Sequence, residues 1–147
     1  MLAAFLLTCE LLSAGARGSR AEYAGGTISQ IPQGCTGNIQ ATDTEYFVFY
    51  AAKARWRVPY ERINLLEYGQ KVDRRYLAAV FVSPLFLLSK KRAHFLTVGY
   101  TDPDGKQQAM IFRVDKNDIR TILVSLEART GRKVDFQDDE ARKAGKG

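Results

Sequence analysis

Residues 117–131, with the sequence NDIRTILVSLEARTG, predict an amphipathic helix near the end of this chain. The apolar residues in it recur at the three- and four-residue spacing of one helix face, and they are Ile119, Ile122, Leu123 and Leu126. We expect the helix to span 117–130, with Asn117 or Asp115 as its cap and Gly131 as the residue that ends it. Such a helix needs an apolar surface to cover, and the residues before it are expected to supply that surface.

The preceding residues form short segments in which apolar and polar side chains alternate, as they do in half-buried strands. The expected strands are 37–41, 45–51, 53–58, 63–68, 76–82, 94–100 and 107–114, with 133–136 as a candidate for a last short strand. Asp102-Pro103-Asp104-Gly105 predicts a hairpin turn, because proline presets φ and glycine tolerates the left-handed conformation. We therefore expect a mainly β fold, an antiparallel barrel or sandwich of about seven strands capped by a C-terminal α-helix.

The strands at 45–51 and 53–58 carry the clearest alternation. In the first, period two places Phe47 and Phe49 on one face, away from Tyr46, Val48 and Tyr50. In the second, it places Ala54, Trp56 and Val58 inward and Lys53, Arg55 and Arg57 outward. Pro59 then ends the strand or marks an edge of the sheet.

The start of the chain resembles a targeting segment. Residues 1–12 are mostly apolar but too few to span a bilayer, and small residues follow them at possible cleavage sites after Ala16 or Ala21. We expect a signal peptide over 1–21 and export to the periplasm or the extracellular space. Glu10 interrupts the apolar run and no Lys or Arg precedes it, so a cytoplasmic protein with an N-terminal helix is the alternative.

The other boundaries follow from composition. Of the 147 residues, 46% are apolar, which suits one globular domain with a core of its own. Residues 22–35 are rich in Gly and Pro and are expected to form an extended linker. The domain is then expected over 36–136, and the charged residues 137–147 are expected to form a flexible tail.

The basic residues are the candidates for a binding surface. The net charge is +6, but cations and acids are interleaved, which is typical of an ordinary solvated surface. One cluster lies on the strand at 53–58 and the other brackets the apolar stretch 76–88. Together they comprise Lys53, Arg55, Arg57, Lys71, Arg74, Arg75, Lys90, Lys91 and Arg92. Cations that flank an apolar segment also suit an anionic membrane surface.

Candidate catalytic and metal-binding groups are few. His94 is the only histidine, and Cys9 and Cys35 are the only cysteines, which falls short of a typical zinc ligand set. The sequence has no phosphate-binding loop and no dinucleotide fingerprint. We expect no cofactor, no metal, no catalytic residues and no enzymatic activity.

The segment Val58-Pro59-Tyr60-Glu61-Arg62-Ile63 leads into a predicted strand. With about seven strands and a C-terminal helix around it, this segment resembles the "I-P-Y-x-x-I" element of bacterial pleckstrin-homology-like (PH-like) domains. The chain departs from that pattern in having Val58 in place of isoleucine. The resemblance implies a non-catalytic platform for lipids, peptides or proteins. The family's phosphoinositide site is not matched, because the loop at 42–44 has no cation.

These observations predict a binding or scaffold module that engages another envelope protein, through an exposed strand edge or an apolar groove beside the helix. Peripheral attachment to anionic membranes through the two basic clusters is the alternative. Nucleic acid is a weaker candidate, although Trp56 and the tyrosines suit base stacking. The sequence does not indicate an oligomeric state.

Overall fold

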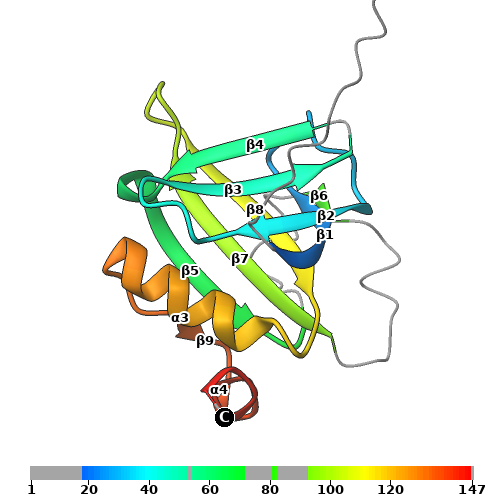
Figure 1. Cartoon of the computed structure of the whole chain (residues 1–147), viewed down its shortest axis with the longest axis vertical. Coiled ribbons are helices and arrows are strands. Elements are labelled where there is room, and N and C mark those ends of the chain that lie inside the picture. The colour runs from blue at the N-terminus through cyan, green and yellow to red at the C-terminus, as the bar shows by residue number, and fades with distance from the viewer. Residues whose placement is uncertain (1–17, 53, 72–80, 83–92, 147) are drawn as a thin grey trace, which may run out of the picture.

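The computed structural model describes residues 18–52, 54–71, 81–82 and 93–146 (Figure 1). Within them the chain forms nine strands, one short 3₁₀ helix and two α-helices. These elements are β1 (Ser19–Gly26), β2 (Cys35–Gln40), β3 (Tyr46–Ala51), β4 (Ala54–Pro59), η1 (Tyr60–Arg62), β5 (Ile63–Gly69), β6 (Phe81–Val82), β7 (His94–Thr101), β8 (Gln107–Val114), α3 (Ile119–Thr130), β9 (Asp135–Phe136) and α4 (Asp139–Lys146).

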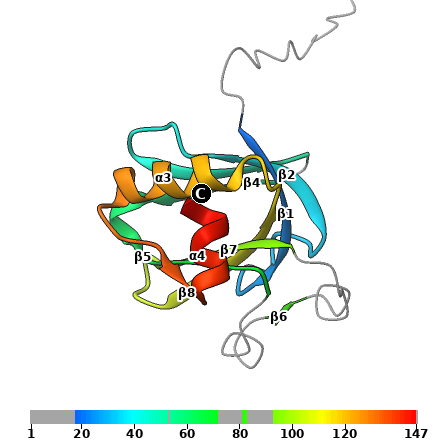
Figure 2. The ribbon, with the colours of Figure 1, turned by 90° about the horizontal axis from the view of Figure 1, so that it is seen from below.

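The strands form one curled sheet that does not close. Their order is β4-β3-β2-β1-β8-β7-β5-β9. The short strand β6 is not part of this linear order and pairs with β1. All neighbours are antiparallel except β5 and β9. Seen from below, α3 and α4 lie across the opening that the strands surround (Figure 2). The predicted mainly β fold with a C-terminal helix is confirmed.

Aromatic side chains fill the space between the two halves of the sheet. Phe47 and Phe49 of β3 are fully buried and approach Phe112 of β8, with ring centroids 5.9 and 5.0 Å apart. Tyr23 of β1 meets the same ring edge-on at 5.8 Å. The predicted common face of Phe47 and Phe49 is confirmed, because alternate residues of a strand point to the same side.

The helix α3 seals this core as the sequence predicts. All four residues of its apolar stripe are buried, and Gly131 ends the helix in the left-handed conformation with φ of 70°. The start of the helix differs from the expectation. Asp118 occupies the cap position, but its side chain makes no capping hydrogen bond. The carbonyl oxygen of Asp115 accepts hydrogen bonds from the amides of Asp118 and Ile119, and its Oδ1 accepts one from the amide of Asn117.

The expected linker over 22–35 is wrong for its first residues. Residues 19–26 form β1, which lies between β2 and β8 in the sheet, so the folded domain begins well before 36. Gly26 there serves close packing, because a Cβ on it would lie 2.3 Å from the Ala109 carbonyl oxygen. Signal cleavage after Ala21 would remove the start of β1, whereas cleavage after Ala16 would leave β1 whole.

The expected flexible tail is also wrong for 139–146, which form α4. Ala141 and Gly145 are buried, and the Phe136 ring lies 2.6 Å from where a Cβ on Gly145 would stand. Asp138 Oδ1 accepts the Ala141 amide at 2.7 Å and so caps the first turn. Two small residues among charged ones are too weak a pattern for a sequence-based prediction of a packed helix.

Of the predicted strand at 76–82, only Phe81 and Val82 lie within the described residues, where they form β6 opposite Gly25 and Gly26. The rest of the apolar stretch 76–88 lies outside them. In the part of the chain that the structure describes, no helix is long and apolar enough to cross a membrane.

Candidate functional site

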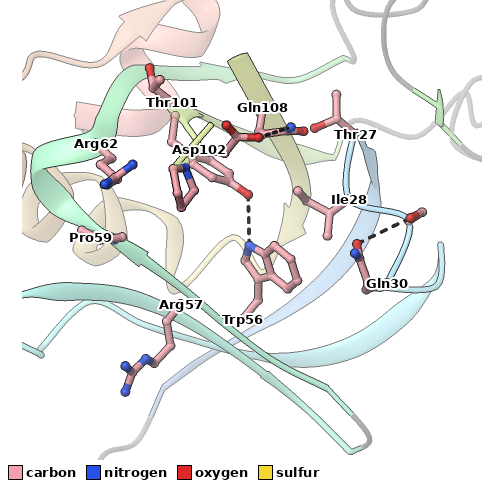
Figure 3. A pocket seen from close by; sticks show the side chains of 13 residues that line it. Thr27, Ile28, Gln30, Trp56, Arg57, Pro59, Arg62, Thr101, Asp102 and Gln108 are labelled. Carbon is pink, nitrogen blue, oxygen red and sulfur yellow. Dashed lines mark hydrogen bonds between the residues drawn. The ribbon is translucent and has the colours of Figure 1, made fainter. Parts of the chain in front are cut away.

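A cleft of about 590 Å³ opens beside β4 (Figure 3). Three segments that are distant in sequence form its walls. They are residues 27–30 after β1, the end of β4 with η1, and the β7–β8 hairpin around Pro103. Among the described strands, β4 begins the order and has β3 as its neighbour on one side alone, so the cleft lies at the open side of the curled sheet.

Trp56 is the central side chain of this cleft. It is half-buried and points into the cleft, and its Nε1 donates a hydrogen bond to the Tyr100 hydroxyl at 3.2 Å. Burial raises the pKa of Tyr100, which the hydrogen bond from Trp56 lowers and the Asp102 carboxylate raises. Tyr100 therefore stays neutral at physiological pH. The buried side chain of Ile28 lies across from the indole and makes this wall apolar.

The polar end of the cleft is formed by Asp102 and Gln108. Gln108 Nε2 donates to Asp102 Oδ2 at 2.9 Å, and Asp102 Oδ1 accepts the amides of Asp104 and Lys106. The Gln108 amide is the main reason that the pKa of Asp102 lies below its ordinary value, and the turn amides contribute further. The carboxylate is therefore ionised, and its acceptor capacity is largely used within the turn.

On the opposite face of β4, the arginines lie flat on tyrosines. The Arg55 guanidinium stands 5.0 Å from the Tyr50 ring centroid and also donates to the Tyr50 hydroxyl at 3.3 Å. The Arg57 guanidinium stands 4.5 Å from the centroid of Tyr46. Cation–π contacts of this kind orient the cations without neutralising them. Both side chains remain exposed to solvent.

The outer edge of β4 also carries backbone groups that pair with no other strand in the described part of the chain. The Tyr60 amide donates to the Glu45 carbonyl at 3.0 Å, next to the β3–β4 ladder. Bonded and non-bonded pairs alternate along an antiparallel ladder. Because the Tyr60 amide bonds toward β3, the residues two and four positions earlier, Val58 and Trp56, also point their N–H and C=O groups to β3. Those of Arg55 and Arg57 point to the open edge, and Figure 1 shows no strand beyond it.

The opposite end of the sheet is occupied. β9 pairs with Glu67 and Tyr68 of β5, and Arg132 Nε donates to the Ile63 carbonyl at 2.7 Å. Unpaired strand edges attract other chains, so natural proteins commonly cover them. Within the described residues, β5 is covered in this way and β4 is not.

A second hollow, of about 600 Å³, lies where α3 ends near η1. Its walls include Glu45, Glu61 and Arg129, so charges of both signs surround it. The buried Tyr60 hydroxyl in this wall has no hydrogen-bond partner among the residues that the structure describes. This hollow is more polar than the groove beside the helix that the sequence led us to expect.

The predicted basic residues are only partly described. Arg55 and Arg57 lie together on β4 and point outward, and Lys71 is exposed just after β5. The others lie outside the described residues, and they are Lys53, Arg74, Arg75, Lys90, Lys91 and Arg92. Apart from Phe81 and Val82, the apolar stretch 76–88 that these cations bracket also lies outside the described residues.

Sequence reasoning missed most of the cleft. Ile28, Tyr100 and Gln108 were not candidates, because nothing in the sequence pattern brings a loop after β1 next to a hairpin some 70 residues later. The signals that did exist were Trp56 within a basic strand and the turn at Pro103. Those two signals could not show that the indole and the turn form one site.

The groups lining the cleft can bind but do not form a recognisable catalytic set. His94 lies elsewhere, where its Nδ1 contacts the Tyr68 hydroxyl and its ring stacks on that of Tyr68. Among the described residues, no three His, Cys, Asp or Glu side chains are grouped so that they could hold a metal ion. In comparisons with family models and with curated proteins, nothing matches this chain.

Proposed function

We propose that this protein is a non-catalytic PH-like binding module that captures an extended segment of a protein partner along β4. The observation that carries the proposal is the unpaired edge of β4 beside the Trp56 cleft. In strand addition, main-chain hydrogen bonds supply affinity and a neighbouring pocket supplies specificity. The outward backbone groups of Arg55 and Arg57 and the adjacent cleft meet both requirements.

The family assignment within this proposal rests on more than the short motif. The segment Val58 to Ile63 spans the end of β4, η1 and the first residue of β5. The strand order, with β1–β4 and the later strands meeting at β1 and β8, is that of a sheet folded over on itself and capped by a C-terminal helix. These features support the PH-like resemblance. We further propose export and a partner in the cell envelope, as the N-terminal segment suggests.

The decisive test distinguishes the contribution of the β4 backbone to peptide binding from the contribution of its arginine charge. Arg57→Ala removes the cation and keeps the N–H, whereas Arg57→Pro removes both, without taking a ladder bond from β3. Random short peptides displayed on phage would be selected against the wild-type domain. We expect selected peptides to bind Arg57→Ala more weakly and to lose binding to Arg57→Pro. A thermal melt of each variant would confirm that it is folded.

Proton–nitrogen NMR spectra then locate the bound peptide. We expect the amides of Arg55 and Arg57 to shift on binding and to become protected from hydrogen exchange. Selected peptides that leave β4 unperturbed, and that bind Arg57→Pro as well as Arg57→Ala, would overturn the proposal.

Attachment to anionic membranes is the second candidate, and the exposed cations Arg55 and Arg57 favour it. Near an anionic surface, each cation contributes roughly 1 kcal/mol. Co-sedimentation with vesicles, with and without phosphatidylserine, tests it. The membrane proposal expects Lys90, Lys91 and Arg92 changed to Glu to release the protein from acidic vesicles. If the triple variant still co-sedimented with acidic vesicles, that result would contradict the proposal of membrane attachment.

A further inference from the structure

Strand addition to β4 also specifies the chemistry of the partner, and this inference rests on the proposed function. We infer that the segment is acidic, with two Asp or Glu residues separated by one large apolar residue. The two acids lie beside Arg55 and Arg57 on the outer face of the sheet. The apolar side chain between them enters the cleft next to Trp56.

The alternation of β4 sets this order. Neighbouring residues of a strand point to opposite faces, and an added strand places its side chains on the same two faces in register. Figure 3 shows Trp56 pointing into the cleft and Arg57 pointing away from the indole, and the guanidiniums of Arg55 and Arg57 lie over the rings of Tyr50 and Tyr46. A partner in register therefore alternates acid, apolar and acid, whether it runs parallel or antiparallel to β4.

The charges of β4 are available to such a partner. Within the described residues, neither Arg55 nor Arg57 forms a salt bridge, whereas Arg113 on β8 pairs with Glu22 at 2.9 Å. Asp43 accepts hydrogen bonds from the amides of Glu45 and Tyr46, which are the main reason that its pKa lies below the ordinary value, and the charges of Arg57 and Arg129 lower it further without forming a salt bridge to it. The arginines are thus fixed on tyrosine rings with their charge unopposed by an ion pair.

The cleft selects the residue between the acids. Trp56, Ile28, Pro59 and Pro103 offer apolar surface, and the volume of about 590 Å³ admits a large side chain. The one carboxylate in the cleft, Asp102, already accepts hydrogen bonds from Gln108 and two backbone amides. A phenylalanine or leucine therefore suits the cleft better than a cation does.

The same charges argue against a second copy of this chain as the occupant. Two β4 strands paired edge to edge across a two-fold axis would place arginines opposite arginines. Like charges directly across from one another destabilise a strand pair. Self-association at β4 is therefore disfavoured, and a partner of opposite charge is favoured.

Three synthetic heptapeptides test the inference. The first, Thr-Val-Glu-Phe-Glu-Val-Thr, has the inferred pattern. The second replaces both Glu with Lys, and the third, Thr-Glu-Val-Phe-Val-Glu-Thr, has the composition of the first but places its acids on the Phe face. Fluorescence of Trp56, the only tryptophan, reports binding to the full chain.

We expect the first peptide to bind about tenfold or more tightly than the other two. The double variant Arg55→Glu and Arg57→Glu should reverse the preference toward the Lys peptide. Equal binding of all three, with shifted β4 amides, would overturn the acidic pattern and leave strand addition standing. If no peptide shifts the β4 amides, strand addition itself fails together with the inference. Sedimentation that shows a dimer through β4 would identify a second copy as the occupant and also overturn it.

Discussion

Trp56 and Tyr100 lie 44 residues apart in sequence, yet the indole Nε1 of one donates to the hydroxyl of the other at 3.2 Å. Trp56 belongs to β4 at one end of the sheet, and Tyr100 belongs to β7 near the other end. No ladder joins these strands directly, so the hydrogen bond spans the open side of the sheet. It also holds the indole in position at the centre of the cleft.

This bond should contribute measurably to stability. We expect Trp56→Phe and Tyr100→Phe to couple by about 1 kcal/mol in a double-mutant cycle, which is the net value of a typical hydrogen bond. Urea unfolding of the wild type, both single variants and the double variant measures the coupling. Strictly additive effects would mean that the bond does not form in solution.

The buried apolar face of α3 should contribute strongly to the free energy of unfolding. Leu126 is fully buried, so Leu126→Ala should lower the free energy of unfolding by about 2–5 kcal/mol. Val124 on the same helix is 66% exposed, and Val124→Ala is the matched control, with an expected effect within about 0.5 kcal/mol. Similar losses for both variants in urea unfolding would contradict the packing described for α3.

Stability should fall as the pH drops below neutral because of His94. Burial lowers the pKa of His94 below its ordinary 6.5, Lys116 lowers it further, and Asp115 raises it. In a neutral imidazole, Nδ1 can accept a hydrogen bond from the Tyr68 hydroxyl, whereas in a protonated imidazole it cannot. The stabilisation is therefore complete above pH 6.5 and is lost as the pH falls through the lower folded-state pKa.

The variant His94→Asn isolates this effect. In urea unfolding between about pH 7.5 and about pH 5, the stability gap between wild type and variant should narrow toward acid pH. The carboxylates of Asp43 and Asp102 titrate below this window, because their pKa values lie under the ordinary 3.8. A gap that does not change with pH would exclude His94 as the titrating group.

Two buried tyrosines offer a matched pair. Burial raises the pKa of both Tyr23 and Tyr60 to about 12, but only the Tyr23 hydroxyl has a partner, the Ile28 carbonyl at 3.3 Å. Tyr23→Phe should therefore cost about 0.5–1.5 kcal/mol, while Tyr60→Phe should be neutral or stabilising. Thermal unfolding of the two variants compares them. A larger loss at Tyr60 would show that its hydroxyl is bonded in solution.

Local patterns account for the parts of the fold that sequence analysis predicted. The strand 107–114 follows the turn at Asp102–Gly105, the helix stripe from Ile119 to Leu126 carries a clear period of 3.6, and each forms as expected. β1 and α4 were missed because most of their buried residues are small, although Tyr23 of β1 is buried as well. Gly26 and Gly145 resemble loop residues in a sequence, although both are buried where a backbone oxygen (at Gly26) or an aromatic ring (at Gly145) approaches too closely for a Cβ.

The sequence by itself determined that this chain is mainly β, that one helix covers its core, and that Trp56 lies between two outward arginines. Periodicity alone decides these features, because it sets which side chains share a face. Only the tertiary structure decided that β4 has an open edge and that residues 27–30, Trp56 and the Pro103 turn meet in one cleft. Strand order and long-range contacts arise from how the whole sheet curls, and no local pattern records them.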